Sequence, residues 1–129
     1  MADVLRAERM PVPVRAARFV LTLQVAFGIA GVAFSVIALA SVGAAFIPLL
    51  LFQVAITSLE GWLLSRWPSR RKPVRWGAVA VEVVSAAALL AIVAIDGDVG
   101  WAGVLPRVLF PLAVVIPLLT PPAGRWFDR

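Results

Sequence analysis

The chain contains no cysteine, no histidine and no tyrosine. Disulfide bonds, thiol chemistry, thiolate or imidazole ligation of a metal and a histidine base are therefore excluded together. Charged residues are also scarce, at 15% of the 129 residues, and the basic ones are eleven arginines and a single lysine. Because most enzyme mechanisms lose their usual groups, we expect neither an enzyme nor a cofactor or metal site.

The residues that remain are strongly apolar. Hydrophobic residues make up 62% of the chain and the mean hydropathy is +0.99, whereas soluble domains are about half apolar and about a quarter charged. A chain of this length provides four segments of about 20 residues and little else. We therefore predict one integral membrane domain over residues 1–129, without an additional soluble domain.

Four apolar stretches are long enough, at about 1.5 Å per residue, to cross a bilayer as helices. They cover residues 19–40, 44–64, 74–95 and 101–119. The last stretch contains three prolines, which interrupt helical hydrogen bonding, so we expect that helix to be kinked. The expected fold is an all-α, four-helix transmembrane bundle.

The basic residues indicate the orientation of this bundle. Nearly all of them lie in the tail of residues 1–18, the connection between the second and third stretches, and the tail of residues 120–129. The other two connections hold none, so the positive-inside rule places both tails in the cytoplasm. The basic residues of the middle connection are candidates for contact with anionic lipid and not with nucleic acid; they are Arg66, Arg70, Arg71, Lys72 and Arg75.

The boundaries of the spans carry two further expectations. Pro11 and Pro13 predict an extended chain before the first span, because proline fixes its own backbone and disfavours helical geometry in the preceding residue. Tryptophan rings prefer the membrane surface, where one end of the ring meets water. The tryptophans expected there are Trp62, Trp67, Trp76 and Trp126 on the inner side and Trp101 on the outer side.

One face of each of the first three spans is small or polar, because its members recur at spacings of three and four residues. In lipid, such faces allow close approach and hydrogen bonding between helices, so we expect them to face the bundle interior. The faces are Gln24, Gly28, Gly31 and Ser35; Gln53, Thr57, Glu60 and Leu64; and Ala78, Glu82, Ser85 and Leu89.

Three polar groups on these faces fall at similar depths. Counted from the expected cytoplasmic edges, Gln24, Glu60 and Glu82 lie about 8, 6 and 12 Å into the membrane. An ionisable residue at such a depth is a hypothesis of function by default, and two neighbouring acids do not easily both ionise. The cluster predicts either a proton- or cation-binding site or uncharged hydrogen bonds that join helices.

Further charges lie near the outer side. Arg107 either extends toward the surface beside Asp96 and Asp98 or lines an outer cavity for an anionic ligand. We favour the first interpretation, because long basic side chains near helix ends commonly reach for the surface.

The pattern of the whole chain resembles the small uncharacterised four-span membrane proteins of actinobacteria. The segments that carry the resemblance are PVPVRAARF before the first span, RRKPVRWGAVAVEVV at the start of the third and PPAGRWFDR at the end. The resemblance implies a multi-pass protein of the bacterial plasma membrane, and it implies no activity.

Two functions are compatible with these features. We favour a small accessory or assembly subunit, bound to a membrane-protein partner or to copies of itself. The alternative is an oligomeric carrier of a small solute, coupled to protons or cations through Glu60 and Glu82. The two hypotheses differ in what the intramembrane acids do.

Overall fold

The computed structural model describes residues 9–97 and 100–128, and this part of the chain is helical and contains no strand. The predicted all-α class is confirmed. The elements in chain order are α2 (Val12–Val42), η1 (Ala44–Phe46), α3 (Ile47–Arg66), η2 (Trp67–Ser69), α4 (Lys72–Asp96), α5 (Trp101–Leu118) and α6 (Pro121–Trp126).

Three segments of the structure are long and apolar enough to cross a membrane, namely Val12–Ser41, Ala44–Ser69 and Lys72–Ile95. Within α5, the stretch Val108–Leu118 is a shorter apolar helix. Large apolar side chains cover the outside of the bundle, as Phe34 shows with 73% of its surface exposed. Such a surface is unfavourable in water and suits lipid, so these are the properties of a helical membrane protein.

The ends of the helices follow from proline and glycine. Pro11 has an extended backbone with ψ 151°, and α2 begins directly after it at Val12. Pro13 lies inside the first helical turn, where its missing amide would have no helical partner in any case. The prediction that the chain stays extended through Pro13 is therefore wrong. At the other ends of α2 and α4, Gly43 (φ 89°) and Gly97 (φ 62°) adopt conformations that favour glycine.

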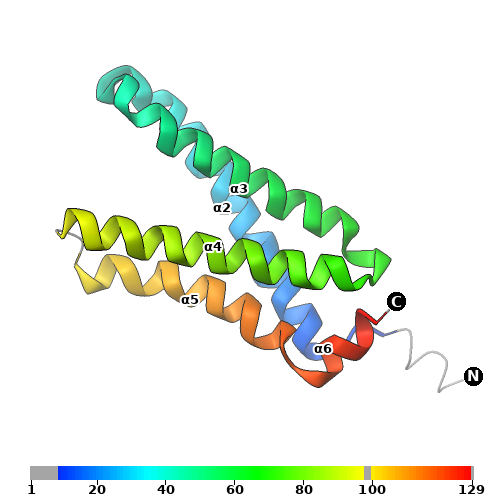
Figure 1. Ribbon diagram of the computed structural model, residues 1–129. Coiled ribbons are helices and arrows are strands. Elements are labelled where there is room, and N and C mark those ends of the chain that lie inside the picture. The colour runs from blue at the N-terminus through cyan, green and yellow to red at the C-terminus, as the bar shows by residue number, and fades with distance from the viewer. Residues whose placement is uncertain (1–8, 98–99, 129) are drawn as a thin grey trace, which may run out of the picture.

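The long helices form two hairpins, α2–α3 and α4–α5, and each helix packs against two others, with α2 on α3 and α5 and α4 on α5 and α3. The start of α2, the α3–α4 connection and α6 lie together at one end of the bundle (Figure 1). We call this the basic end, because the basic cluster of residues 66–75 lies there. Toward the opposite end, the open end, the hairpins separate (Figure 1).

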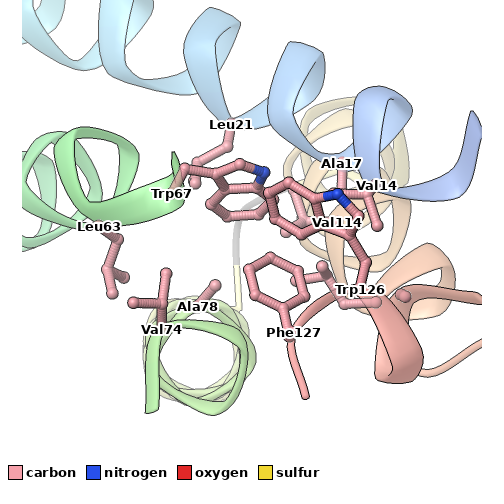
Figure 2. Close-up of a cluster of buried hydrophobic side chains, with 12 residues drawn as sticks. Val14, Ala17, Leu21, Leu63, Trp67, Val74, Ala78, Val114, Trp126 and Phe127 are labelled. Carbon is pink, nitrogen blue, oxygen red and sulfur yellow. The ribbon is translucent and has the colours of Figure 1, made fainter. Parts of the chain in front are cut away.

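The main hydrophobic core is a cluster at the basic end. Figure 2 shows the rings of Trp67, Trp126 and Phe127 meeting between the helices. Phe127 lies 5.2 Å from Trp67 and 4.7 Å from Trp126 between ring centroids, edge to face in both pairs, a favourable arrangement of aromatic rings. Buried aliphatic side chains from all the long helices and α6 surround them: Val14, Ala17, Leu21, Leu63, Val74, Ala78, Val114, Leu118 and Ala123.

This cluster corrects the prediction for two tryptophans. Trp67 is fully buried and Trp126 is 6% exposed, so neither ring lies at a lipid surface. Trp62 and Trp76, at 55% and 51% exposure, do remain on the outside of the bundle. The C-terminal segment causes the difference, because α6 folds back under the bundle and carries Trp126 and Phe127 into it.

The core predicts which ring stabilises the fold. Phe127→Ala should cost about 3–5 kcal/mol, because deleting a buried aromatic ring loses its contacts and leaves a cavity. Phe34→Ala removes the same atoms from an exposed position and is the matched control. Thermal unfolding in detergent measures both variants. Equal losses for the two would contradict the assignment of the core to the basic end.

Candidate functional site

Two glycines of α2 let that helix approach α3 closely. A Cβ atom at Gly28 would lie 2.5 Å from Thr57 Oγ1, and one at Gly31 would lie 2.5 Å from Gln53 Nε2. One turn further, Ser35 Oγ donates a hydrogen bond to Gln53 Oε1 at 3.3 Å. The small face of the first span and the polar face of the second therefore lie against each other.

A hydrogen bond joins α2 to α4 deeper in the bundle. Gln24 Nε2 donates to Glu82 Oε2 at 3.1 Å, and Glu82 is fully buried. The amide oxygen of Gln24 and the second carboxyl oxygen of Glu82, both Oε1, are buried and have no partner among the described residues. Since buried polar atoms are normally paired, this contact is only half satisfied.

Glu60 lies on α3 and faces the same region. Its side chain is only 5% exposed, and it is close enough to Glu82 for their charges to interact. Among the side chains that the structure describes, none forms a hydrogen bond or ion pair with Glu60. The structure therefore brings two buried carboxyl groups together without a basic partner in its described part.

A cleft of about 550 Å³ lies between the four long helices, and Glu60 is in its wall. Glu82 is not in the wall, but Gln24, which binds it, is. The cleft is not enclosed, and the hairpins separate toward the open end (Figure 1). Its other lining residues are Gly28, Ser35, Leu49, Phe52, Gln53, Ile56, Thr57, Ser85, Ala88, Leu89, Ile92, Phe110 and Pro111.

The buried core lies next to the cleft on the side of the basic end. Leu21, Leu63 and Ala78 belong to the buried core. Leu21 lies one helical turn from Gln24, Leu63 one turn from Glu60, and Ala78 one turn from Glu82. The order along α2, α3 and α4 is therefore the same: a core residue, then an acid or its amide partner, then the cleft. The acids lie where the cleft meets the core.

The predicted polar cluster thus occupies one region of the bundle. Gln24, Gln53, Thr57, Glu60 and Ser85 line the cleft, and Glu82 lies behind Gln24. Ser85 does not bond to another helix, because its hydroxyl donates to the carbonyl oxygen of Val81 on its own helix at 2.8 Å.

The predicted outer charges are a different case. The side chains of Asp96 and Arg107 and the whole of Asp98 lie outside the described part of the structure. The proposed pairing of Arg107 with the two acids stays a prediction.

Two arginines of the basic cluster bind the C-terminal segment. Arg75 Nε donates to the carbonyl oxygen of Leu118 at 2.7 Å, and its guanidinium lies 4.9 Å from the ring centroid of Trp76. Arg70 Nε donates to the backbone carbonyl oxygen of Trp126 at 3.2 Å, and the guanidinium of Arg70 lies 4.9 Å from the ring centroid of Trp126. The last carbonyl groups of a helix have no partner within that helix, and these bonds satisfy one such group at the end of α5 and one at the end of α6. Together with the contact between Arg70 and the ring of Trp126, they hold α6 against the bundle.

The remaining basic side chains of the cluster are more exposed. Lys72 Nζ lies 2.7 Å from Asp128 Oδ1, and both side chains are more than half exposed, so this ion pair contributes little to stability. The guanidinium of Arg66 lies 5.8 Å from the ring of Trp62, and Arg71 is exposed. Contact of these groups with anionic lipid stays a prediction.

Two features of the site were not predicted from the sequence. The first is the pair of phenylalanines in the cleft wall, Phe52 and Phe110, for which the sequence gives no signal beyond their apolar character. The second is α6. Thr120 followed by prolines is a typical helix start, since proline suits the first turn, and this signal was available.

The chain matches no known family model, no curated protein and no solved structure. Its chemistry therefore has to be inferred from the site. Two carboxyl groups at the closed end of a cleft in an apolar bundle can take up protons or attract cations. Within the described residues, no group of three or more metal-ligating acidic side chains is present.

The close approach of α2 and α3 leads to a prediction about stability. Gly28→Ala should cost about 1–3 kcal/mol, because the new methyl group meets the stiff, β-branched Thr57. Gly31→Ala should cost less, since the flexible side chain of Gln53 can turn away. Gly61→Ala is the control, because a Cβ there has no neighbour within 4 Å. Thermal unfolding in detergent should rank the three variants in this order, and equal midpoints for Gly28→Ala and Gly61→Ala would contradict it.

Proposed function

We propose that the chain is a multi-pass protein of the bacterial inner membrane with four spans and both termini in the cytoplasm. The three membrane-length segments and the apolar α5 support four crossings, because 18 residues of helix extend about 27 Å. Prolines within α5 kink it, and neighbouring helices accommodate the bend. The basic end then faces the cytoplasm and the open end faces outward.

Labelling of introduced cysteines tests this orientation, and the native chain has none to interfere. A cysteine at Ser69, in the basic α3–α4 connection, should be protected in intact cells from a thiol reagent that cannot cross the membrane. A cysteine at Gly97 should be labelled, because it lies in the α4–α5 turn at the open end. Labelling of Ser69 from outside, with Gly97 protected, would reverse the orientation.

Within this topology, the best-supported function is that of a proton- or cation-coupled carrier of a small solute. The observation that carries the proposal is Glu60, a buried carboxyl group in the cleft wall with no partner among the described residues and a second acid nearby. A residue that only joins helices would be expected to complete its hydrogen bonds, because an unpaired buried polar group costs free energy. Glu60 instead lies in the wall of the cleft without a hydrogen-bond partner among the described residues.

The same geometry suggests how the carrier works. Ligand and protons reach the acids from the open end, while the aromatic cluster closes the path to the basic end. Release into the cytoplasm requires the hairpins to separate at the basic end, where Arg70 and Arg75 hold the C-terminal segment. Carriers commonly alternate in this way by moving one helical unit against another.

Neutral amide variants test the role of the acids. Glu60→Gln should abolish a pH-dependent carboxyl signal in infrared difference spectra while leaving the unfolding midpoint near that of the parent. Glu82→Gln should change stability by about 1 kcal/mol or less, because its amide oxygen can still accept the hydrogen bond from Gln24. Asp128→Asn, at an exposed acid, is the control and should leave the signal unchanged. A parent without any such signal, or a signal that survives in Glu60→Gln, would defeat the carrier proposal.

The accessory-subunit function remains the second candidate, because the cleft is not enclosed and has polar groups in its wall. A helix of a partner could fill it and satisfy those groups. Purification in mild detergent separates the two candidates. Recovery of the chain with a larger membrane partner favours the accessory subunit, and recovery alone or as a homo-oligomer favours the carrier.

A further inference from the structure

We propose that the cleft binds an organic monocation, an ammonium group with apolar substituents. This inference rests on the proposed function, since it names the class of solute that the same cleft would take. It is carried by three observations: the charge of the cleft wall, its size and the side chains that face the ligand.

The charge of the wall favours a cation. Glu60 is the one ionisable residue among the described residues that line the cleft, and Glu82 lies nearby. Arg70 and Arg75 are bound to backbone carbonyls at the basic end. A buried carboxylate requires a counter-charge. The described wall offers none, and a cationic ligand would supply it.

The size of the cleft and its donor set argue against a divalent metal ion. A volume of about 550 Å³ lies in the range of sites for small organic molecules, about 300–1,000 Å³. Divalent ions need several oxygen ligands close together, and the described residues contain no group of three acidic or other metal-ligating side chains. The volume therefore suits a ligand with a carbon skeleton.

The remaining side chains indicate the character of that skeleton. Leu49 and Ile92 lie toward the open end of the cleft, and the phenylalanines Phe52 and Phe110 are also in the wall. Aromatic rings attract cations, and aliphatic side chains accept apolar substituents. Gln53 adds a neutral polar group. An ammonium ion placed near Glu60 would thus have its apolar part against these side chains.

Equilibrium dialysis in detergent with radiolabelled benzyltrimethylammonium tests the proposal, because this probe keeps its charge at every pH. The parent should bind it saturably, and benzenesulfonate, of similar size and opposite charge, should not bind. Glu60→Gln should weaken binding about thirty-fold or more, as expected when one partner of a buried charge pair is lost. Phe110→Leu should weaken it about two- to ten-fold through the lost ring. Asp128→Asn should bind like the parent, and unfolding midpoints should show that every variant is folded.

Three results would overturn the proposal: no saturable binding of benzyltrimethylammonium, equal binding by Glu60→Gln, or equal binding of benzenesulfonate. Uptake of the cation into proteoliposomes under a pH gradient tests the carrier function separately. Binding that depends on Glu60 without uptake supports the ligand class and contradicts transport. A carboxyl signal that depends on Glu60 without binding of the cation keeps proton coupling and rejects the ligand class.

Discussion

The contact of Trp67, Trp126 and Phe127 at the basic end holds the two hairpins of this bundle together. Two parts of the chain that are distant in the sequence meet there, η2 and the end of α6. Nearly all of the fully buried apolar side chains belong to this cluster. Because the buried core lies at this end, the two hairpins are free to separate at the other, and the cleft is the result.

The position of the acids follows from that packing. Glu60 and Glu82 lie one helical turn beyond core residues of their own helices, at the point where tight packing gives way to the cleft. One acid is bound by Gln24, and the other is not bound by any described residue. The pair thus combines a carboxyl group held in place by Gln24 with a carboxyl group in the wall of the cleft.

The basic cluster contributes to the tertiary structure. Arg70 donates to the carbonyl oxygen of Trp126, next to Phe127, and Arg75 donates to the carbonyl oxygen of Leu118 at the end of α5. Residues of the basic cluster therefore also tie the ends of α5 and α6 to the rest of the bundle. Any opening at the basic end would have to break these hydrogen bonds. Arg70 and Arg75 therefore stabilise the arrangement in which that end is packed.

Much of the fold could be predicted from the sequence, because it depends on local properties. Apolar stretches of membrane length and spacings of three and four residues predicted the helices and the faces on which Gln24, Gly28, Glu60 and Glu82 lie. Helix limits were less predictable, since Pro13 fits both an extended chain and a first helical turn. The burial of Trp67 and Trp126 could not be predicted from the chemistry of their rings, because an amphipathic ring suits a membrane surface and an aromatic core equally well.

The sequence by itself determined that this chain forms apolar helices with polar groups on defined faces, because periodicity and composition act within each helix. Only the tertiary structure decided which faces meet, because that depends on packing between helices distant in the sequence. It joined Gln24 to Glu82 and left Glu60 facing a cleft. It also folded α6 back beneath the bundle, so that a segment expected to be a tail closes one end of the site.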